Sequence, residues 1–259
     1  MRRVIFNQKG GVGKSTITCN LAAISAQLGF NTLVIDLDPQ ANTSQYVLGN
    51  KSTQMNTTIV DFFQDMLNLS LRKKELQQFI QTSPFNHLDI LPSHPDLAEL
   101  ETKLESRYKI YKLRDALKKL TQYDFIYIDT PPALGFYTLC ALIAADTCLI
   151  PFDCDEFSRR SLYHLIGNIT EIQQDHNNNL RIEGIIVNQY ESRAIQSKKI
   201  VKELIDDGLP VMDVYLSHSI KIRESHEKSQ PMIHLDPNHK LSLEFKALYE
   251  KLHQPHGKK

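Results

Sequence analysis

A glycine-rich segment close to the N-terminus constrains this chain more than any other stretch. Residues 9–16 read K-G-G-V-G-K-S-T, between an apolar run at 4–6 and a helix-like segment at 17–28. Glycine has no Cβ, so this segment can adopt positive φ angles and turn several N–H groups toward one anion. The positive end of the helix that follows points toward the same anion. A strand, a glycine loop and a helix in this order predict a phosphate-binding loop.

Two side chains of this loop are suited to a phosphorylated ligand that carries a metal ion. Lys14 supplies a mobile positive charge for the terminal phosphates, and the hydroxyl of Ser15 is placed to bind Mg²⁺. The alternative is a glycine-rich turn that binds no ligand. The residues expected to contact the ligand are Gly10, Gly11, Val12, Gly13, Lys14, Ser15 and Thr16.

Length and charge set broad limits. The 259 residues suffice for one large α/β domain, and no linker or repeat divides them, so we predict a single domain over residues 1–259. Lys plus Arg equals Asp plus Glu at 30 each, so any nucleic-acid-binding surface has to be local. No apolar run approaches the roughly 18 residues of a membrane span, and no signal-peptide pattern is present, which favours a cytoplasmic protein. The four cysteines lack a C-x-x-C motif, as expected of reduced thiols in a core.

Two further strands end in acidic residues. The apolar segment 31–35 leads into Asp36 and Asp38, and the segment 125–128 leads into Asp129. In open parallel sheets, ligands bind beyond the carboxyl ends of the strands, and Mg²⁺ between phosphates requires carboxylates nearby. Asp129 is therefore expected to bind a water of the Mg²⁺ ion or the loop hydroxyl, with capping of the next helix as its alternative. For Asp36, accepting N–H bonds at a turn is as plausible as a catalytic role.

Hydrophobic periodicity predicts the remaining elements. Helices are expected at 58–69, 71–80, 96–105, 111–120, 157–174, 196–206 and 241–252, and strands at 88–91, 146–151 and 182–187. Strands that alternate with helices in this way indicate the α/β class, with a doubly wound, mostly parallel sheet flanked by helices. Phe62, Phe63 and Phe79 fit a core better than a partner surface.

Lys9 makes the loop unusual, because an ordinary phosphate-binding loop needs a single lysine. With Lys9, the segment 9–16 resembles the deviant Walker A motif of the ParA/MinD family of ATPases. The segment D-L-D-P-Q at 36–40 is similar to the switch I motif of that family, and D-T-P-P at 129–132 is similar to its switch II. The resemblance covers nearly the whole chain, and it is greatest to partition ATPases of the ParA type.

The resemblance implies ATP and Mg²⁺ as ligands and slow hydrolysis of ATP to ADP and phosphate. It implies that Lys9 reaches across an ATP-bridged homodimer to the nucleotide of the partner subunit. It also implies that Asp38 positions the attacking water or contacts the Mg²⁺ shell. The implied catalytic residues are Lys9, Lys14 and Asp38, and the implied metal-binding residues are Ser15, Asp38 and Asp129.

The resemblance relates two segments of the C-terminal half to the nucleotide. Asn188 follows a predicted strand, at a place where several members of the superfamily contact adenine, and an amide offers one donor and one acceptor for that purpose. Ser217 and His218 replace the proline and arginine of a family segment. The nucleotide contact of that segment is therefore not carried over.

The same half contains a local group of basic residues. ParA proteins bind DNA without sequence preference through basic residues in this part, and each phosphate they neutralise releases counterions. The positions that resemble this group are Arg193, Lys198, Lys199, Lys202, Lys221 and Arg223. The alternative is a solvated helix face. The resemblance implies double-stranded DNA and a ParB-like or cargo-adaptor protein as partners, with a nucleoid-associated location.

Two other functions stay open. A membrane-associated positioning ATPase similar to MinD or FlhG would use an amphipathic C-terminal helix, and residues 241–252 contain an apolar stripe. A helix that packs on the sheet shows the same stripe, and the polar tail at 253–259 has no apolar anchor, so we expect core packing and no membrane binding. A P-loop small-molecule synthetase, as in cobyrinate or dethiobiotin synthesis, needs a substrate pocket, for which the sequence shows no motif.

Overall fold

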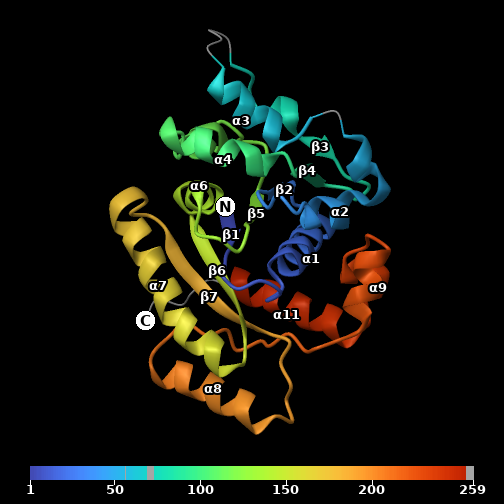
Figure 1. Cartoon of the computed structure of the whole chain (residues 1–259). Coiled ribbons are helices and arrows are strands. Elements are labelled where there is room, and N and C mark those ends of the chain that lie inside the picture. The colour runs from blue at the N-terminus through green and yellow to red at the C-terminus, as the bar shows by residue number, and fades with distance from the viewer. Residues whose placement is uncertain (56, 69–72, 255–259) are drawn as a thin grey trace.

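A seven-stranded sheet forms the centre of the molecule (Figure 1). The computed structural model describes residues 1–55, 57–68 and 73–254. In spatial order the strands are β3 (Gln81–Thr82), β4 (Leu88–Leu91), β2 (Thr32–Asp36), β5 (Phe125–Asp129), β1 (Arg2–Ile5), β6 (Thr147–Asp153) and β7 (Arg181–Asn188). All neighbouring strands are parallel except β3 and β4. This arrangement confirms the predicted doubly wound, mostly parallel sheet.

The register brings the carboxyl ends of three strands to one edge of the sheet. Ile5, the last residue of β1, pairs with Asp129 of β5. Asp36, the last residue of β2, also pairs with Asp129. The segments that leave β1, β2 and β5 therefore start side by side, at the edge where open parallel sheets bind ligands. These segments carry the glycine motif and the predicted carboxylates.

Helices cover both faces of the sheet (Figure 1). The first face carries α3 (Ile59–Leu67), α4 (Leu97–Ser106), α5 (Lys112–Leu117), α6 (Phe136–Ala144), α7 (Glu156–His176) and α8 (Ile195–Asp206). The second face carries α1 (Lys14–Gln27), α2 (Asn42–Leu48), α9 (Lys221–Glu227), α10 (Met232–Leu235) and α11 (Lys240–His253). Successive strand residues point to opposite faces, so Val4 and Phe6 join the first core and Ile5 joins the second.

Most predicted elements are present with boundaries shifted by a few residues. The prediction of a helix at 71–80 is wrong for the described part, because only Leu76–Phe79 forms a short 3₁₀ turn before β3; residues 71 and 72 lie outside the described residues. Leu76 and Phe79 are both buried, and their spacing of three suits a single 3₁₀ turn. The sequence does not predict α6, because eight of its nine residues are buried and show no helical period.

The C-terminal helix packs on the sheet, as expected. Four apolar side chains of α11 are buried in the second core, namely Leu241, Phe245, Leu248 and Leu252. The three phenylalanines predicted for the core are buried in the first one, namely Phe62, Phe63 and Phe79. Three of the four cysteines are buried, namely Cys19, Cys140 and Cys148. Within the described residues, the helices are all too short or too polar to cross a membrane.

Candidate functional site

The loop between β1 and α1 has the conformation that its glycines allow. Gly11 and Gly13 have φ angles of 76° and 92°, which residues with a Cβ rarely adopt. α1 begins directly after Gly13, and its first turn contains no acidic residue, so this helix end favours an anion. A Cβ at position 13 would lie 2.3 Å from Nδ2 of Asn188. Glycine is therefore needed at this position for its backbone angle and for the close approach of Asn188.

Lys14 lies over the loop in a nearly buried position. The residue is 7% exposed, and its Nζ donates a 3.1 Å hydrogen bond to the backbone carbonyl of Lys9. Burial lowers the pKa of Lys14, whereas the negative charges of Asp129 and Asp38 act to raise it. The ammonium group of Lys14 therefore lies in the same site as the carboxylates of Asp129 and Asp38. A phosphate and a divalent cation are the ligands that such a mixture of charges suits.

Asp129 is buried and incompletely paired. Its Oδ2 accepts a 2.7 Å hydrogen bond from Oγ1 of Thr43, whereas its Oδ1 has no partner among the described residues. Burial raises the pKa of Asp129, and the nearby hydroxyl groups of Ser15 and Thr43 oppose that increase. A buried carboxylate oxygen without a partner is costly until a ligand satisfies it. Mg²⁺ prefers oxygen ligands of this kind, so Ser15 and Asp129 fit a magnesium ion bound together with a phosphate.

Asp36 accepts hydrogen bonds at a turn, which was the alternative to a catalytic role for this residue. Its carboxylate accepts hydrogen bonds from the backbone N of Ser44 at 2.8 Å, from Oγ of Ser44 at 2.7 Å and from N of Asp38 at 3.0 Å. Burial raises the pKa of Asp36, and the charge of Asp129 raises it further. Asp38 itself is 9% exposed, and its Oδ1 accepts a 2.9 Å bond from N of Gln40. The two carboxylates of the D-L-D segment thus differ, since Asp36 shapes the turn that presents Asp38.

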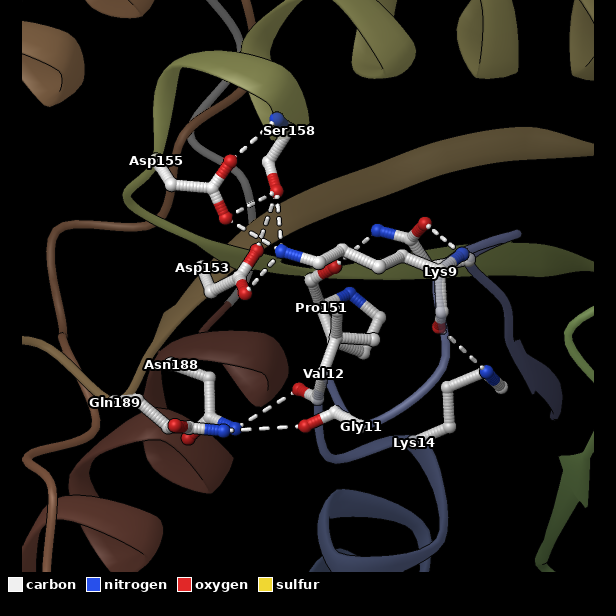
Figure 2. A network of polar contacts seen from close by, with 11 residues as sticks. Lys9, Gly11, Val12, Lys14, Pro151, Asp153, Asp155, Ser158, Asn188 and Gln189 are labelled. Carbon is white, nitrogen blue, oxygen red and sulfur yellow. Dashed lines mark hydrogen bonds and ion pairs between the residues drawn. The ribbon is translucent and has the colours of Figure 1, made fainter.

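The side chain of Lys9 extends away from Lys14 toward the end of β6 and the start of α7 (Figure 2). Its Nζ lies 2.6 Å from Oδ2 of Asp153, 2.5 Å from Oδ2 of Asp155 and 2.9 Å from Oγ of Ser158. Burial acts to lower the pKa of Lys9, but the hydrogen bonds to both carboxylates outweigh it and raise the pKa. Within one chain, the first lysine of the motif therefore binds carboxylates rather than lining its own loop.

Two amides at the end of β7 also hold the loop (Figure 2). Asn188 donates a 2.9 Å hydrogen bond from Nδ2 to the carbonyl of Val12. Gln189 donates a 3.1 Å hydrogen bond from Nε2 to the carbonyl of Gly11. Gln189 has a φ angle of 53°, which is uncommon for a residue other than glycine. The end of β7 is therefore fastened to the phosphate-binding loop.

A cavity of about 220 Å³ adjoins the loop. Its walls include Thr16 from the first turn of α1, Asn188 from β7, and Ser217, His218 and Arg223 from the segment around α9. The cavity lies beside the N-terminal end of α1. The adenine contact of Asn188 stays a prediction, because its amide also holds the loop.

The six predicted DNA-contacting residues do not form one patch. Arg193 precedes α8 and is exposed, and α8 exposes Lys198, Lys199 and Lys202. Lys221 and Arg223 belong to α9, which lies apart from α8 (Figure 1). The α9 pair has other contacts, since Lys221 binds Glu224 at 2.8 Å and Arg223 lines the cavity. The structure thus groups the four residues at α8 and separates them from the two on α9.

Several residues of the site were not predicted from the sequence. Asp153 and Asp155 bind Lys9, Thr43 binds Asp129, and His226 contacts Thr16. For the first pair a signal was present, because D-C-D-E at 153–156 begins two positions after the predicted strand at 146–151. Threonine and histidine carry no comparable signal, since both are common in ordinary surfaces and cores.

Comparison with known proteins identifies relatives that match most of the chain. A family profile described as an AAA domain matches residues 3–182. The chromosome partitioning protein ParA of Myxococcus xanthus is 35% identical over 251 residues, which cover 96% of this chain and 86% of that protein. The sporulation initiation inhibitor protein Soj of Bacillus subtilis is 31% identical over 238 residues, which cover 90% of each chain.

The fold is also shared with a solved enzyme structure. Cobyrinic acid a,c-diamide synthase from Mycobacterium smegmatis, with bound ADP and magnesium, is 25% identical to this chain. The two structures superpose with a TM-score of 0.79, over 96% of this chain and 92% of the synthase. Sequence identity over most of the chain is higher to the ParA relatives than to the synthase. The chain belongs to the ParA/MinD family of P-loop ATPases.

Proposed function

We propose that this single-domain protein hydrolyses ATP in the manner of ParA proteins, with ATP joining two copies of the chain and hydrolysis separating them. The observation that carries the proposal is the convergence of Lys14, Ser15 and Asp129 at the glycine loop. Oδ1 of Asp129, which no other described residue satisfies, supports a cation at this place. ATP with Mg²⁺ supplies the phosphate oxygens and the cation that this group suits.

The residues of the site have separate roles in hydrolysis. The N–H groups of residues 10–16 and the ammonium group of Lys14 bind the phosphates, while Ser15 and Asp129 hold the metal ion. Magnesium, when bound, neutralises charge that develops on the phosphate oxygens. Asp38 orients the attacking water, and Lys9 of a second copy adds a positive charge at the terminal phosphate. Catalysis of this type consists mostly of positioning and charge stabilisation.

The exposed lysines of α8 suit a nucleic-acid backbone. Lys198, Lys199 and Lys202 lie within little more than one helical turn, and Arg193 precedes them. Because an ATP-bound dimer presents two such groups at once, it binds DNA more tightly than the monomer does. A ParB-like or cargo-adaptor protein then stimulates hydrolysis. The cycle would position a chromosome, a plasmid or a protein cluster on the nucleoid.

Sedimentation velocity tests the proposal. The wild type is expected to sediment as a dimer with ATP and Mg²⁺ and as a monomer with ADP. The Lys9→Ala variant is expected to bind nucleotide and to stay monomeric in both states. Lys103→Ala, which removes an exposed charge from α4, is the matched control and should behave as the wild type. Identical sedimentation of the wild type with ATP and ADP would contradict the proposal.

The likeness to cobyrinic acid a,c-diamide synthase supports a second candidate function, a small-molecule synthetase that binds ATP in the same loop. Such an enzyme forms a product from an acceptor substrate only while it cleaves ATP. An assay of product formation with carboxylic acid substrates separates the two candidates. A membrane-associated role has less support, because the apolar stripe of α11 is buried in the second core.

A further inference from the structure

A histidine connects α9 to the phosphate-binding loop. Nε2 of His226, on α9, lies 3.0 Å from Oγ1 of Thr16, the last residue of the glycine motif. The imidazole also stacks on Tyr46 of α2, with ring centroids 4.1 Å apart and an angle of 15° between the planes. His226 therefore contacts the helix that follows the loop and the helix that follows the switch-like segment.

A buried polar network fixes these contacts. The hydroxyl of Tyr46 lies 2.5 Å from Oγ of Ser225, next to His226 in the chain. It also accepts a 3.3 Å hydrogen bond from Nδ2 of Asn20 on α1. Tyr46, Ser225 and Asn20 are all buried. Because an unmade hydrogen bond is costly in such surroundings, a shift of one member of the network displaces the others.

α2 joins this network to the predicted metal site. Oγ1 of Thr43, in the first turn of α2, donates a 2.7 Å hydrogen bond to Asp129. Ser44, the next residue, binds Asp36 through its N and Oγ atoms. Tyr46 follows three residues after Thr43, about one helical turn along. α9 is thus linked to the loop through Thr16 and to the strand-end carboxylates through α2.

We propose that His226 is a positioning residue that couples nucleotide binding at Thr16 to the orientation of α9. Thr16 has one hydroxyl proton and lines the cavity beside the loop. A phosphate oxygen only accepts hydrogen bonds, so Thr16 donates its proton to a bound phosphate. Oγ1 of Thr16 can then bond to His226 only as an acceptor, which requires a proton on Nε2. Nucleotide binding therefore selects the Nε2–H form of the imidazole. A ring that starts in the Nδ1–H form releases the Nδ1 proton to water and takes up a proton from water at Nε2.

This inference rests on the proposed nucleotide binding, and it predicts an effect on the basic residues of α9. Arg223 precedes His226 by three residues and lines the same cavity. Lys221 begins the helix and binds Glu224. Lys221, Arg223 and His226 belong to one short helix, so any displacement of His226 on nucleotide binding would move both cations with it. The two basic residues that lie apart from α8 would thereby follow the nucleotide state.

Nitrogen-15 NMR of the histidine side chains tests the coupling without measuring hydrolysis. The His226 signals are assigned by comparing the wild type with His226→Phe and His226→Gln. On addition of ADP and Mg²⁺, the Nε2 signal of the wild type is expected to move to the position of a protonated ring nitrogen. His234, which stacks on Phe85, is the control and should not move.

The variants provide a second readout. His226→Phe keeps an aromatic ring on Tyr46 and removes the bond to Thr16, so its nucleotide affinity should fall roughly two- to tenfold, as for one missing hydrogen bond. His226→Gln should retain most of the affinity, and His234→Phe should be unchanged. Unchanged His226 signals in the nucleotide-saturated wild type would overturn this inference and leave the proposed function intact. No nucleotide binding by the wild type would overturn the proposed function as well.

Discussion

Nζ of Lys9 lies 2.5 Å from Oδ2 of Asp155 in the same chain. The lysine that the proposed dimer needs at the other subunit's nucleotide is thus bound to a carboxylate of its own subunit. Both side chains are partly exposed, at 39% and 42%. Separating such a pair costs little, because water and salt screen it. An exchange of this carboxylate for a phosphate of the second subunit is therefore feasible at each cycle.

The first prediction concerns this ion pair. Asp155 caps α7, with its Oδ1 accepting a 2.7 Å hydrogen bond from N of Ser158, and asparagine caps helices equally well. Asp155→Asn therefore removes one of the two carboxylate charges that hold Lys9, leaves Asp153 in place and keeps the helix start. We expect the ATP-dependent dimer to form at a several-fold lower protein concentration, as measured by light scattering. Asp175→Asn, an exposed neutralisation on the same helix, is the control. Weaker dimerisation of Asp155→Asn would show that this carboxylate serves the dimer instead.

The second prediction concerns Thr43. Thr43→Val removes the hydrogen bond to Oδ2 of Asp129 and keeps the shape of the side chain. Partners of metal-binding carboxylates typically contribute roughly 10- to 100-fold to metal affinity. We expect the Mg²⁺ concentration needed for tight nucleotide binding to rise by an amount in that range, measured by calorimetry at a series of Mg²⁺ concentrations. Thr43→Ser keeps the hydroxyl and should resemble the wild type. An identical Mg²⁺ dependence for the valine variant would argue against the role of Asp129.

The third prediction concerns DNA. Replacing Lys198, Lys199 and Lys202 with glutamine should weaken binding to any duplex sequence. For each phosphate that the variant no longer neutralises, the slope of log affinity against log salt should decrease in magnitude by about 0.9. A control variant removes the same charge elsewhere, by replacing the exposed residues Lys103, Lys118 and Lys119. Equal decreases in the two triple variants would mean that only net charge matters and that α8 is no specific DNA-binding element.

The fourth prediction concerns stability against pH. Nε2 of His253 lies 3.1 Å from a guanidinium nitrogen of Arg3, and its Nδ1 lies 2.6 Å from the carbonyl of Tyr249. Arginine only donates, so Nε2 accepts, Nδ1 donates and the ring is neutral. Burial lowers the pKa of His253 from its usual 6.5. The unfolded chain therefore takes up a proton near pH 6.5 while the folded chain does not, and stability falls as the pH drops through that value.

Thermal unfolding between pH 7.5 and 5.5 measures this effect. The midpoint of the wild type should fall more steeply over this range than that of His253→Gln, which has no titrating ring. His164→Gln, at an exposed position of α7, should follow the wild-type curve. Parallel curves for the wild type and His253→Gln would exclude this histidine as a source of the pH dependence.

Features that depend on local sequence and sheet register were predictable. The glycine loop needs only neighbouring residues, and the strand ends at Asp36 and Asp129 meet because β2 and β5 are parallel and adjacent. The apolar stripe of α11 likewise predicted its burial.

Features that depend on tertiary packing were not predictable. Thr16 and His226 are 210 positions apart, and only the packing of α9 against α1 brings them together. The carboxylate partners of Lys9 belong to the distant β6–α7 junction. The basic residues were grouped by resemblance to ParA proteins, whereas the fold places α8 and α9 apart (Figure 1). Sequence patterns therefore located the nucleotide loop, and the connections around it required the structure.

The central claim is that ATP produces a DNA-binding dimer through Lys9. Binding to random-sequence duplex DNA at moderate salt, with ATP, with ADP or without nucleotide, tests this claim most directly when the wild type is compared with Lys9→Ala. We predict tight binding of the wild type only with ATP, a steep decrease with salt, and no binding by the variant. Equal binding in all three nucleotide states, or no binding in any of them, would contradict the account.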